Sequence, residues 1–359
     1  MPSGVMAQNI ALLIHSKQKQ QQQQQDLKSQ QDVTFACHHT SHLLLHEHDA
    51  FTHLLQMKKP LIISTANEYD KTNGIHVPPA RLEDVMHTFE SLEQQGEDND
   101  DATKVISTLI LELPHREIGG KCTPWDDVLQ IKQFLKDQNI AFHCDGARLV
   151  EAAAGYGLSL PEVAQPFDSI YISFYKGLDS IAGAMLLGNK DFCDEARIWL
   201  RRFGGNLYTL LPYAVSSWDG YRKHTLVDDD DDMTSTTKIV SFQEKQRKLT
   251  RIVQQLSSDA VVKKCIAFDP PTPETNMLHV YLKASKEHCE KARDETMIQT
   301  NIRVFHRIRE VFSKGHPACD IGNFQCYLEL TMGDGNVGLE DDVFLEGWKT
   351  FASCLSKLE

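Results

Sequence analysis

A continuous apolar run in the first third of the chain is the feature that most restricts its fold. The segment KVISTLILEL, residues 104–113, lacks the polar alternation of a strand that faces water on one side. Runs of this kind are typical of strands that are buried on both faces of a parallel sheet, where helices cover each face. The chain is therefore expected to contain an α/β sheet.

Strand-like and helix-like segments alternate on both sides of this run. The hydrophobic spacing predicts strands at residues 33–36, 61–64, 140–144 and 169–173, and helices at residues 5–14, 47–55, 82–92 and 125–136. Such alternation favours a mostly parallel α/β sheet. Functional side chains are then expected at the carboxyl ends of the strands, where the loops converge.

The rest of the chain predicts a smaller second domain. Two helices are expected at 191–203 and 207–221, followed by an acidic run at 228–232 and by α+β segments at 241–256, 278–282 and 325–331. We predict a large domain over residues 1–225 and a small C-terminal domain over 226–359. Residues 17–31 are dominated by glutamine and are expected to be a disordered insertion in the large domain.

Composition and charge argue against several classes of protein. The formal net charge is −13 and no stripe of lysines and arginines stands out, so a nucleic-acid partner is not expected. There is neither a secretory pattern nor a run of about 20 apolar residues, so no membrane association is expected and a cytoplasmic location is predicted, with organelle import left open. Nine scattered cysteines without a CxxC pair indicate reduced thiols, without disulfides or structural zinc.

Two polar motifs each follow a predicted strand. They are HCDGARLVEA, residues 143–152, and SIYISFYKGL, residues 169–178. Asp145 could face the pyridine nitrogen of pyridoxal phosphate and keep it protonated, and Lys176 could condense with the cofactor aldehyde. Arg148, three residues after Asp145 and expected on the same side of a starting helix, could bind a substrate carboxylate. The alternative is an Asp–Arg pair that caps a helix, beside an ordinary surface lysine.

These two motifs, followed by RRFGG at residues 201–205, resemble the threonine aldolase group of the β-eliminating lyases. MPSGVMAQNIALL resembles the family's phosphate loop, CHHTSHLLLHE its ring-stacking segment, and LELPHREIGG the turn that carries another active-site histidine. The resemblance covers about the first 220 residues. It implies the fold of the fold-type I pyridoxal-phosphate enzymes, with a Schiff base on Lys176. The implied reaction cleaves a β-hydroxy-α-amino acid, threonine or allo-threonine, to glycine and an aldehyde.

The resemblance also implies which residues bind the cofactor phosphate. Ser3 and Gly4 would offer donors at the N-terminus of a helix, and Ser173 would contribute a second hydroxyl. Val5 stands where the family usually has a threonine. The missing hydroxyl would weaken phosphate binding by about 1 kcal/mol if no water replaces it.

Two histidines receive roles from the same resemblance. His42 would lie flat on the cofactor ring, and His115 would be the base near the substrate hydroxyl, a task that suits an imidazole. For His115 the alternative is a polar turn residue beside Arg116. For His42 the alternative is a metal site with His38 and His46, which could align if the segment were helical; we expect no metal.

The chain departs from the family pattern in two respects. It begins at the phosphate loop, whereas the family has a further N-terminal segment that packs near the site. The family's second carboxylate-binding arginine would fall within 326–334, where no arginine occurs, and Asn206, Leu207 and Tyr208 replace the commoner arginine after Gly205. Two alternatives therefore stay open: a β-eliminating lyase that acts on another amino acid, and an inactive truncated subunit that keeps the fold. The family implies a homodimer or homotetramer.

Overall fold

The computed structural model describes residues 1–23, 33–65, 77–94, 105–225, 240–311 and 323–358. The chain divides into two compact units. The first unit comprises Met1–Asn67, Pro79–Pro114 and Cys122–Met233, and the second comprises Glu68–Pro78, His115–Lys121 and Thr234–Glu359. The predicted large domain of residues 1–225 therefore includes two short segments that belong to the second unit. Sequence patterns report local structure only, so they could not assign these segments.

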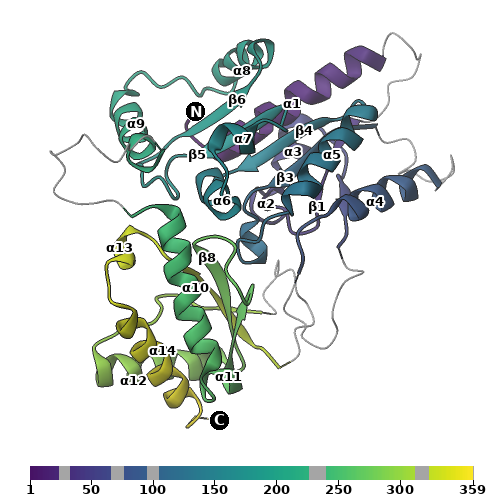
Figure 1. Ribbon diagram of the computed structural model, residues 1–359. Helices are drawn as coiled ribbons and strands as arrows, with labels where there is room; N and C mark the ends of the chain where they lie inside the picture. The colour runs from purple at the N-terminus through teal and green to yellow at the C-terminus, as the bar shows by residue number, and fades with distance from the viewer. Residues whose placement is uncertain (24–32, 66–76, 95–104, 226–239, 312–322, 359) are drawn as a thin grey trace. The chain divides into compact units, whose positions relative to one another are not determined.

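The first unit is built on a six-stranded sheet with the strand order β2-β1-β3-β4-β5-β6 (Figure 1). The strands are β1 (Val33–His38), β2 (Leu61–Ile63), β3 (Val105–Glu112), β4 (Ala141–Gly146), β5 (Ser169–Ser173) and β6 (Ala184–Gly188). The first five strands pair in parallel, and β6 pairs antiparallel with β5. The predicted mostly parallel α/β sheet is confirmed, and β6 was not predicted.

The apolar run predicted to be a doubly buried strand is β3, in which every residue after Val105 is buried. Helices supply the cover: α1 (Gly4–Gln23) contacts five of the six strands, with α3 (Ala50–Leu55) and α8 (Lys190–Arg202) beside it. In the view of Figure 1, α1 lies behind the sheet and α5 (Trp125–Asp137) in front of it. Helix α4 (Leu82–Gln94) packs against α5.

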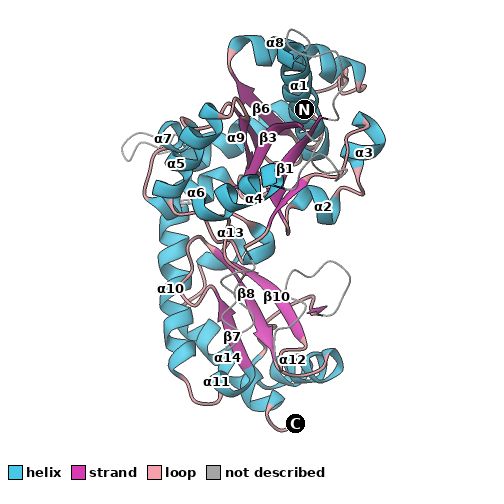
Figure 2. Ribbon diagram, turned by 90° about the vertical axis from the view of Figure 1, so that its right-hand side faces the viewer, coloured by secondary structure: helices cyan, strands magenta, loops and turns pink. Residues whose placement is uncertain are grey.

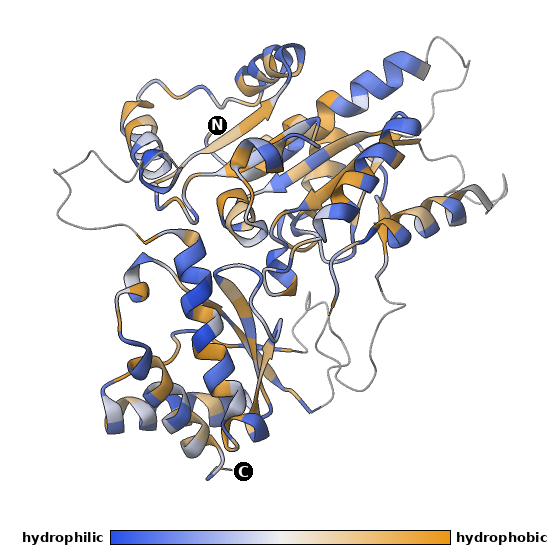
Figure 3. Cartoon of the chain, in the orientation of Figure 1, coloured by the Kyte–Doolittle hydropathy of each residue, from blue (hydrophilic) through white to orange (hydrophobic). Residues whose placement is uncertain are grey.

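Helix α1 is longer than predicted, and residues 17–23 of the predicted disordered tract are helical. Its first half is anchored by buried Ala7, Ile10 and Ile14. Glutamine is a good helix former, so the helix continues without further burial once the apolar part is docked. Figure 3 shows this change as a turn from hydrophobic to hydrophilic colour along α1. Residues 24–31 of the tract lie outside the described residues.

Two other helices begin or end differently from the prediction. Of the helix predicted at 47–55 only α3 forms, because His48 and Asp49 adopt positive φ angles, and a short helix that was not predicted, α2 (His42–His46), precedes it. Helix α9 (Leu211–Thr225) starts four residues later than predicted. Its second residue is Pro212, which favours the first turn of a helix.

Over its described residues, the second unit contains an antiparallel sheet with the order β7-β8-β10-β9 and α-helices beside it (Figure 2). The strands are β7 (Ile266–Asp269), β8 (Met277–Leu282), β9 (Arg309–Glu310) and β10 (Cys326–Thr331). The helices are α10 (Phe242–Ser258), α11 (Val262–Cys265), α12 (Lys286–Thr300), α13 (Asp334–Val337) and α14 (Asp341–Leu355). Side chains of Ile252, Val280 and Phe351 contribute to one buried core. No helix among the described residues is long and apolar enough to cross a membrane.

Candidate active site

Two buried carboxylates end neighbouring strands of the first unit. Glu112 is the last residue of β3, and its register partner on β4 is Asp145. Burial, together with the charge of Glu112, raises the pKa of Asp145 to about 7, while Lys176 and His42 act in the opposite direction. A buried carboxylate beside a second one stays ionised only if a positive group compensates it.

Lys176 lies in the turn that follows β5, the strand next to β4. Its positive charge lowers the pKa of Asp145, so the two side chains lie near each other in the first unit. The turn is held by backbone hydrogen bonds from Asp179 N–H to the Lys176 carbonyl (3.0 Å) and from Ser180 N–H to the Phe174 carbonyl (2.9 Å). The lysine side chain is half-buried.

His42 is the first residue of α2 and lies beside both carboxylates. Its backbone N–H donates to a Glu112 carboxylate oxygen, and its Nδ1 is 3.2 Å from Glu47 Oε1. Burial lowers the pKa of His42, but the hydrogen bond with Glu47 and the charges of Asp145 and Glu112 outweigh it, so the net pKa is raised. The ring is thereby held in place by Glu47.

The metal-site alternative required His38, His42 and His46 to share one helix. His38 instead ends β1, where its ring bonds Thr40 (2.8 Å) and Thr65 (3.2 Å). The helical alignment was therefore wrong. Within the described ranges, no three His, Cys, Asp or Glu side chains are grouped so that they could hold a metal ion.

The N-terminus of α1 meets the end of β5 around Tyr171. A Cβ at Gly4 would come within 2.2 Å of the Tyr171 hydroxyl, so this position has no room for a side chain. The Ser173 hydroxyl is buried near Tyr171 and has no hydrogen-bond partner within 3.5 Å among the described residues. The Ser3 hydroxyl accepts from the Met6 N–H at 3.3 Å. Backbone donors of a helix start and an unsatisfied buried hydroxyl form a suitable site for an anion such as phosphate.

Val5 and Arg148 are the remaining predicted site residues of the first unit. Val5 is in the first turn of α1, and its side chain has no hydroxyl to offer. Arg148 is the residue before α6 (Leu149–Tyr156), and its Nε lies 3.7 Å from Glu151 Oε2. The expectation that Asp145 and Arg148 share one side of a starting helix is wrong, because β4 continues to Gly146.

His115 belongs to the second unit. It is buried, and its backbone N–H donates to the Lys121 carbonyl at 2.8 Å in the turn that contains a short 3-10 helix, η2 (Arg116–Ile118). In the same unit, Lys121 Nζ is 2.8 Å from Asp269 Oδ1. The first unit thus brings together Asp145, Lys176, His42 and Ser173, whereas the role of His115 as a base stays a prediction.

Sequence reasoning missed three residues. Glu112 is the last residue of β3 and Tyr171 is the central residue of β5, and Arg309 lies on β9 opposite Tyr327, at 3.5 Å from its hydroxyl. Glu112 could have been found, because it is a lone acidic residue at the end of the apolar run. Arg309 could not, because its pairing with the arginine-free segment 326–334 depends on a contact between distant parts of the chain.

Comparisons with known proteins identify the family of the chain. The family model described as Beta-eliminating lyase matches residues 1–290. The low specificity L-threonine aldolase of Escherichia coli K12 is 36% identical over 105 residues, a match that spans 29% of this chain and 30% of that protein. The match therefore covers less than a third of that relative's length.

Solved structures extend the similarity over nearly the whole chain. A protein from Listeria monocytogenes, provisionally named an L-allo-threonine aldolase, is 28% identical with a TM-score of 0.74, over 98% of this chain and 80% of that one. An Oryza sativa protein solved with PLP shares the fold at 12% identity and a TM-score of 0.59, over 100% of this chain and 68% of that one. The fold is that of the fold-type I pyridoxal-phosphate enzymes, and the chain belongs to the beta-eliminating lyase family.

Proposed function

We propose that this chain is a pyridoxal-phosphate-dependent lyase that cleaves a β-hydroxy-α-amino acid, threonine or allo-threonine, to glycine and an aldehyde. The observation that carries the proposal is the placement of Asp145 and Lys176 at the ends of adjacent strands, close enough for the lysine charge to lower the pKa of the carboxyl group. Family membership and the named L-threonine aldolase relative support the same reaction class.

The residues present fit the cofactor at three points. Asp145 is a buried carboxylate with a raised pKa, and the N–H of a protonated pyridine nitrogen would supply the positive partner that keeps it ionised. The buried Ser173 hydroxyl and the start of α1 would take the phosphate. The Lys176 amine would take the aldehyde. Each point uses a different functional group of the cofactor.

The cofactor, when bound, withdraws electrons from the amino acid's Cα. The residues of this chain then divide the remaining tasks. Arg148 binds the substrate carboxylate, and His42, held by Glu47, fixes the plane of the ring. His115 takes the proton of the β-hydroxyl, the Cα–Cβ bond breaks, and Lys176 Nζ holds the proton that Cα regains. The products are glycine and an aldehyde.

A second candidate is β-elimination on another amino acid. It is favoured by the absence of arginine from residues 326–334, most of which form β10, since that change alters how a substrate carboxylate would be bound. Product analysis separates the reactions, because β-elimination releases ammonia and a 2-oxo acid whereas aldol cleavage releases glycine and an aldehyde.

The decisive experiment records the absorbance spectrum of the purified protein with pyridoxal phosphate and then adds threonine or allo-threonine. We expect a Schiff-base band and release of acetaldehyde. Lys176→Ala should remove the band and lower kcat by about three orders of magnitude or more, since the covalent attachment is lost. Lys291→Ala, at an exposed helical position, is the matched control. A band that survives in Lys176→Ala would refute the lysine assignment, and a colourless, inactive wild-type protein would favour the inactive subunit.

We also propose that the chain forms a homodimer or homotetramer. Several large apolar side chains on α9 are exposed, among them Leu211 at 72%, Val215 at 57% and Trp218 at 59%. Large apolar side chains that are exposed together on one helix are characteristic of a protein interface. Light scattering of the pure protein should report a mass of two or four chains, and Trp218→Lys should shift it towards one.

A further inference from the structure

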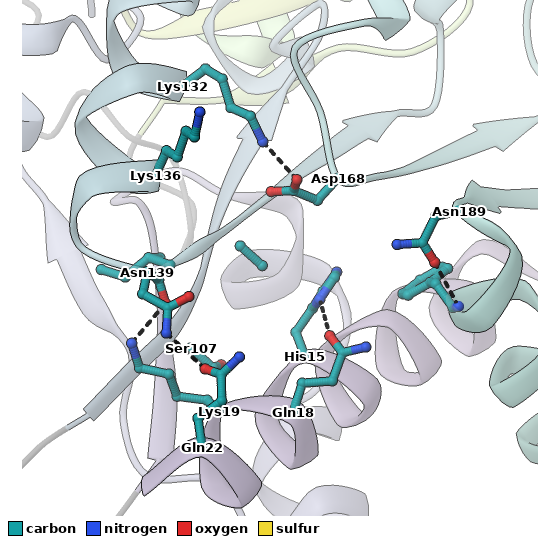
Figure 4. Close-up of a pocket in the computed structure, with 13 residues that line it drawn as sticks. His15, Gln18, Lys19, Gln22, Ser107, Lys132, Lys136, Asn139, Asp168 and Asn189 are labelled. Carbon is teal, nitrogen blue, oxygen red and sulfur yellow. Dashed lines mark hydrogen bonds and ion pairs between the residues drawn. The ribbon is translucent and has the colours of Figure 1, made fainter.

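A separate polar cavity lies at the amino ends of the strands of the first unit's sheet, whereas the candidate active site lies at their carboxyl ends. It measures about 420 Å³ and is lined from α1, α5, α8 and the amino ends of the strands (Figure 4). Ala141, in its wall, begins β4, whereas Asp145 lies four residues further along that strand. Four residues of strand span about 13 Å. The cavity is therefore distinct from the candidate active site.

Three lysines surround this cavity although the whole chain carries a formal net charge of −13. Lys132 and Lys136 are four residues apart on α5 and so lie on one face of that helix. Lys19 extends from α1 to the C-terminal end of α5, and its Nζ donates to the carbonyl of Asn139, just after that helix, at 2.7 Å. The lining contains one carboxylate, Asp168, so its formal charge is 3 − 1 = +2.

Asp168 is already bound by other groups. Lys132 Nζ lies 2.6 Å from one carboxylate oxygen, and the Phe142 N–H donates to the other at 2.7 Å. Lys136 makes no ion pair with any residue for which the structure gives a position. An ammonium group has three N–H donors, so Lys136 and Lys132 retain donors for a ligand. Asn189 accepts from the Phe192 N–H at 2.9 Å through Oδ1, and its amide nitrogen points into the cavity (Figure 4).

The wall of the cavity is rigid and partly apolar. His15 is buried, and its Nε2 lies 2.7 Å from Ser169 Oγ, which also bonds His143. Phe192, Ile140 and Ala141 supply apolar surface beside the polar rim. A volume of about 420 Å³ is within the range of sites for small organic molecules, which combine apolar walls with a few placed polar groups.

We propose that this cavity binds a small organic anion that carries a phosphate group or two carboxylates on an apolar body. The anionic part pairs with Lys136, Lys132 and Lys19, and the apolar part packs on Phe192 and Ile140. The proposal does not depend on the reaction at the other edge of the sheet. If the lysines only bind the backbone carbonyl groups at the end of α5, the cavity will bind no such anion. The experiment below distinguishes this structural role from ligand binding.

The test is isothermal titration of the protein loaded with one equivalent of pyridoxal phosphate, with free cofactor removed by dialysis, so that the proposed cofactor site is filled and the cavity stays open to the probes. The probes are phenyl phosphate, inorganic phosphate, phthalate and benzoate. We expect saturable one-site binding in which phenyl phosphate binds at least fivefold more tightly than inorganic phosphate, because only the former reaches the apolar wall. Phthalate should bind more tightly than benzoate, because it has two carboxylates. The ratio of phenyl phosphate to phthalate affinity identifies the preferred anionic group.

Lys136→Met is the cleanest variant, because this side chain has no structural ion pair to lose. It should raise the Kd for the preferred probe at least fivefold, and Lys19→Met/Lys136→Met at least twentyfold, with circular dichroism showing an intact fold. Lys291→Met removes an equal charge from the second unit and should leave the Kd unchanged. The proposal is overturned if wild type shows no saturable binding, or if the lysine variants bind as wild type does.

Discussion

Two buried polar clusters of the first unit differ in charge: one consists of neutral groups and the other contains two carboxyl groups. Alternation along β4 and β5 places His143 and Asp145 on one face of the sheet, with Ser169 and Ser173 on the same face of the next strand. At the amino edge, Ser169 Oγ lies 2.7 Å from both His15 Nε2 and His143 Nδ1, and His143 Nε2 lies 2.7 Å from Gln8 Oε1. At the carboxyl edge, two carboxylates adjoin and a hydroxyl lacks a partner.

This difference separates a structural cluster from a functional one. Burial lowers the pKa of His15 to about 4 and that of His143 to about 3, so both rings are neutral near pH 7 and their hydrogen bonds hold α1 on the sheet. Burial and the charge of Glu112 raise the pKa of Asp145 instead, to about 7, so this carboxyl group titrates near neutral pH in the cofactor-free protein. A buried carboxyl group whose pKa is shifted towards neutrality is the kind of group expected at a functional site.

The strongest way to break the comparison is Asp145→Asn. We expect kcat to fall about a thousandfold or more, because the amide cannot keep the pyridine nitrogen protonated. The same substitution should raise the stability of the cofactor-free protein by about 1 kcal/mol, because it removes a buried like charge next to Glu112. Denaturant unfolding and a steady-state assay measure the two effects. Glu90→Gln, on the exposed face of α4, is the control, and a less stable Asp145→Asn protein would contradict the comparison.

In the cluster at the amino ends of the strands, His143→Leu should lower the stability of the protein, whereas Asp145→Asn should raise it. It leaves the buried Gln8 oxygen and Ser169 hydroxyl with fewer partners, which should cost about 1–3 kcal/mol of unfolding free energy. Chemical denaturation would measure this loss. His87→Leu, at an exposed position of α4, should change the stability by less than about 0.5 kcal/mol. If both substitutions behave alike, the cluster does not hold α1.

The pH dependence of stability should distinguish the two buried histidines from Asp145. Between pH 6.5 and about 4, the unfolded chain binds protons at His15 and His143 that the folded chain excludes, so lowering the pH favours unfolding. Each histidine contributes at most about 1.4 kcal/mol per pH unit. Asp145 acts in the opposite sense between about pH 7 and its unfolded value near 3.8, because the folded state binds the proton first.

Cofactor-free Asp145→Asn should therefore lose stability on acidification more steeply than cofactor-free wild type. Unfolding free energies at pH 7, 6 and 5 for the two proteins would test this. Equal slopes would mean that Asp145 does not hold a proton in the folded chain near neutral pH.

The smallest expected effect concerns the phosphate end of the carboxyl edge. Val5→Thr adds a hydroxyl in the first turn of α1 and should tighten cofactor binding by about 1 kcal/mol, roughly fivefold in Kd. Val5→Ala is the control that removes apolar volume without adding a donor. Fluorescence titration with pyridoxal phosphate measures both, and equal affinities would indicate that this position does not face the phosphate.

The amino-acid sequence by itself determined the class of fold. The apolar run that became β3 required cover on both faces, and the polar motifs that follow Phe142 and Ile172 predicted that Asp145 and Lys176 lie at the ends of adjacent strands. These inferences succeeded because burial and strand period are local properties of a sequence. The same locality explains why the sequence alone could not show that residues 115–121 group with the second unit.

Only the tertiary structure decided which polar groups meet. Glu112 lies beside Asp145, His15 reaches Ser169 across 154 residues, and Lys19 of α1 reaches the end of α5. Each contact joins segments whose spacing in the sequence carries no signal, and each depends on the packing of α1 across the sheet or on the strand order. The charge of a side chain can be read from the sequence, whereas its pKa and its partners depend on what the fold places around it.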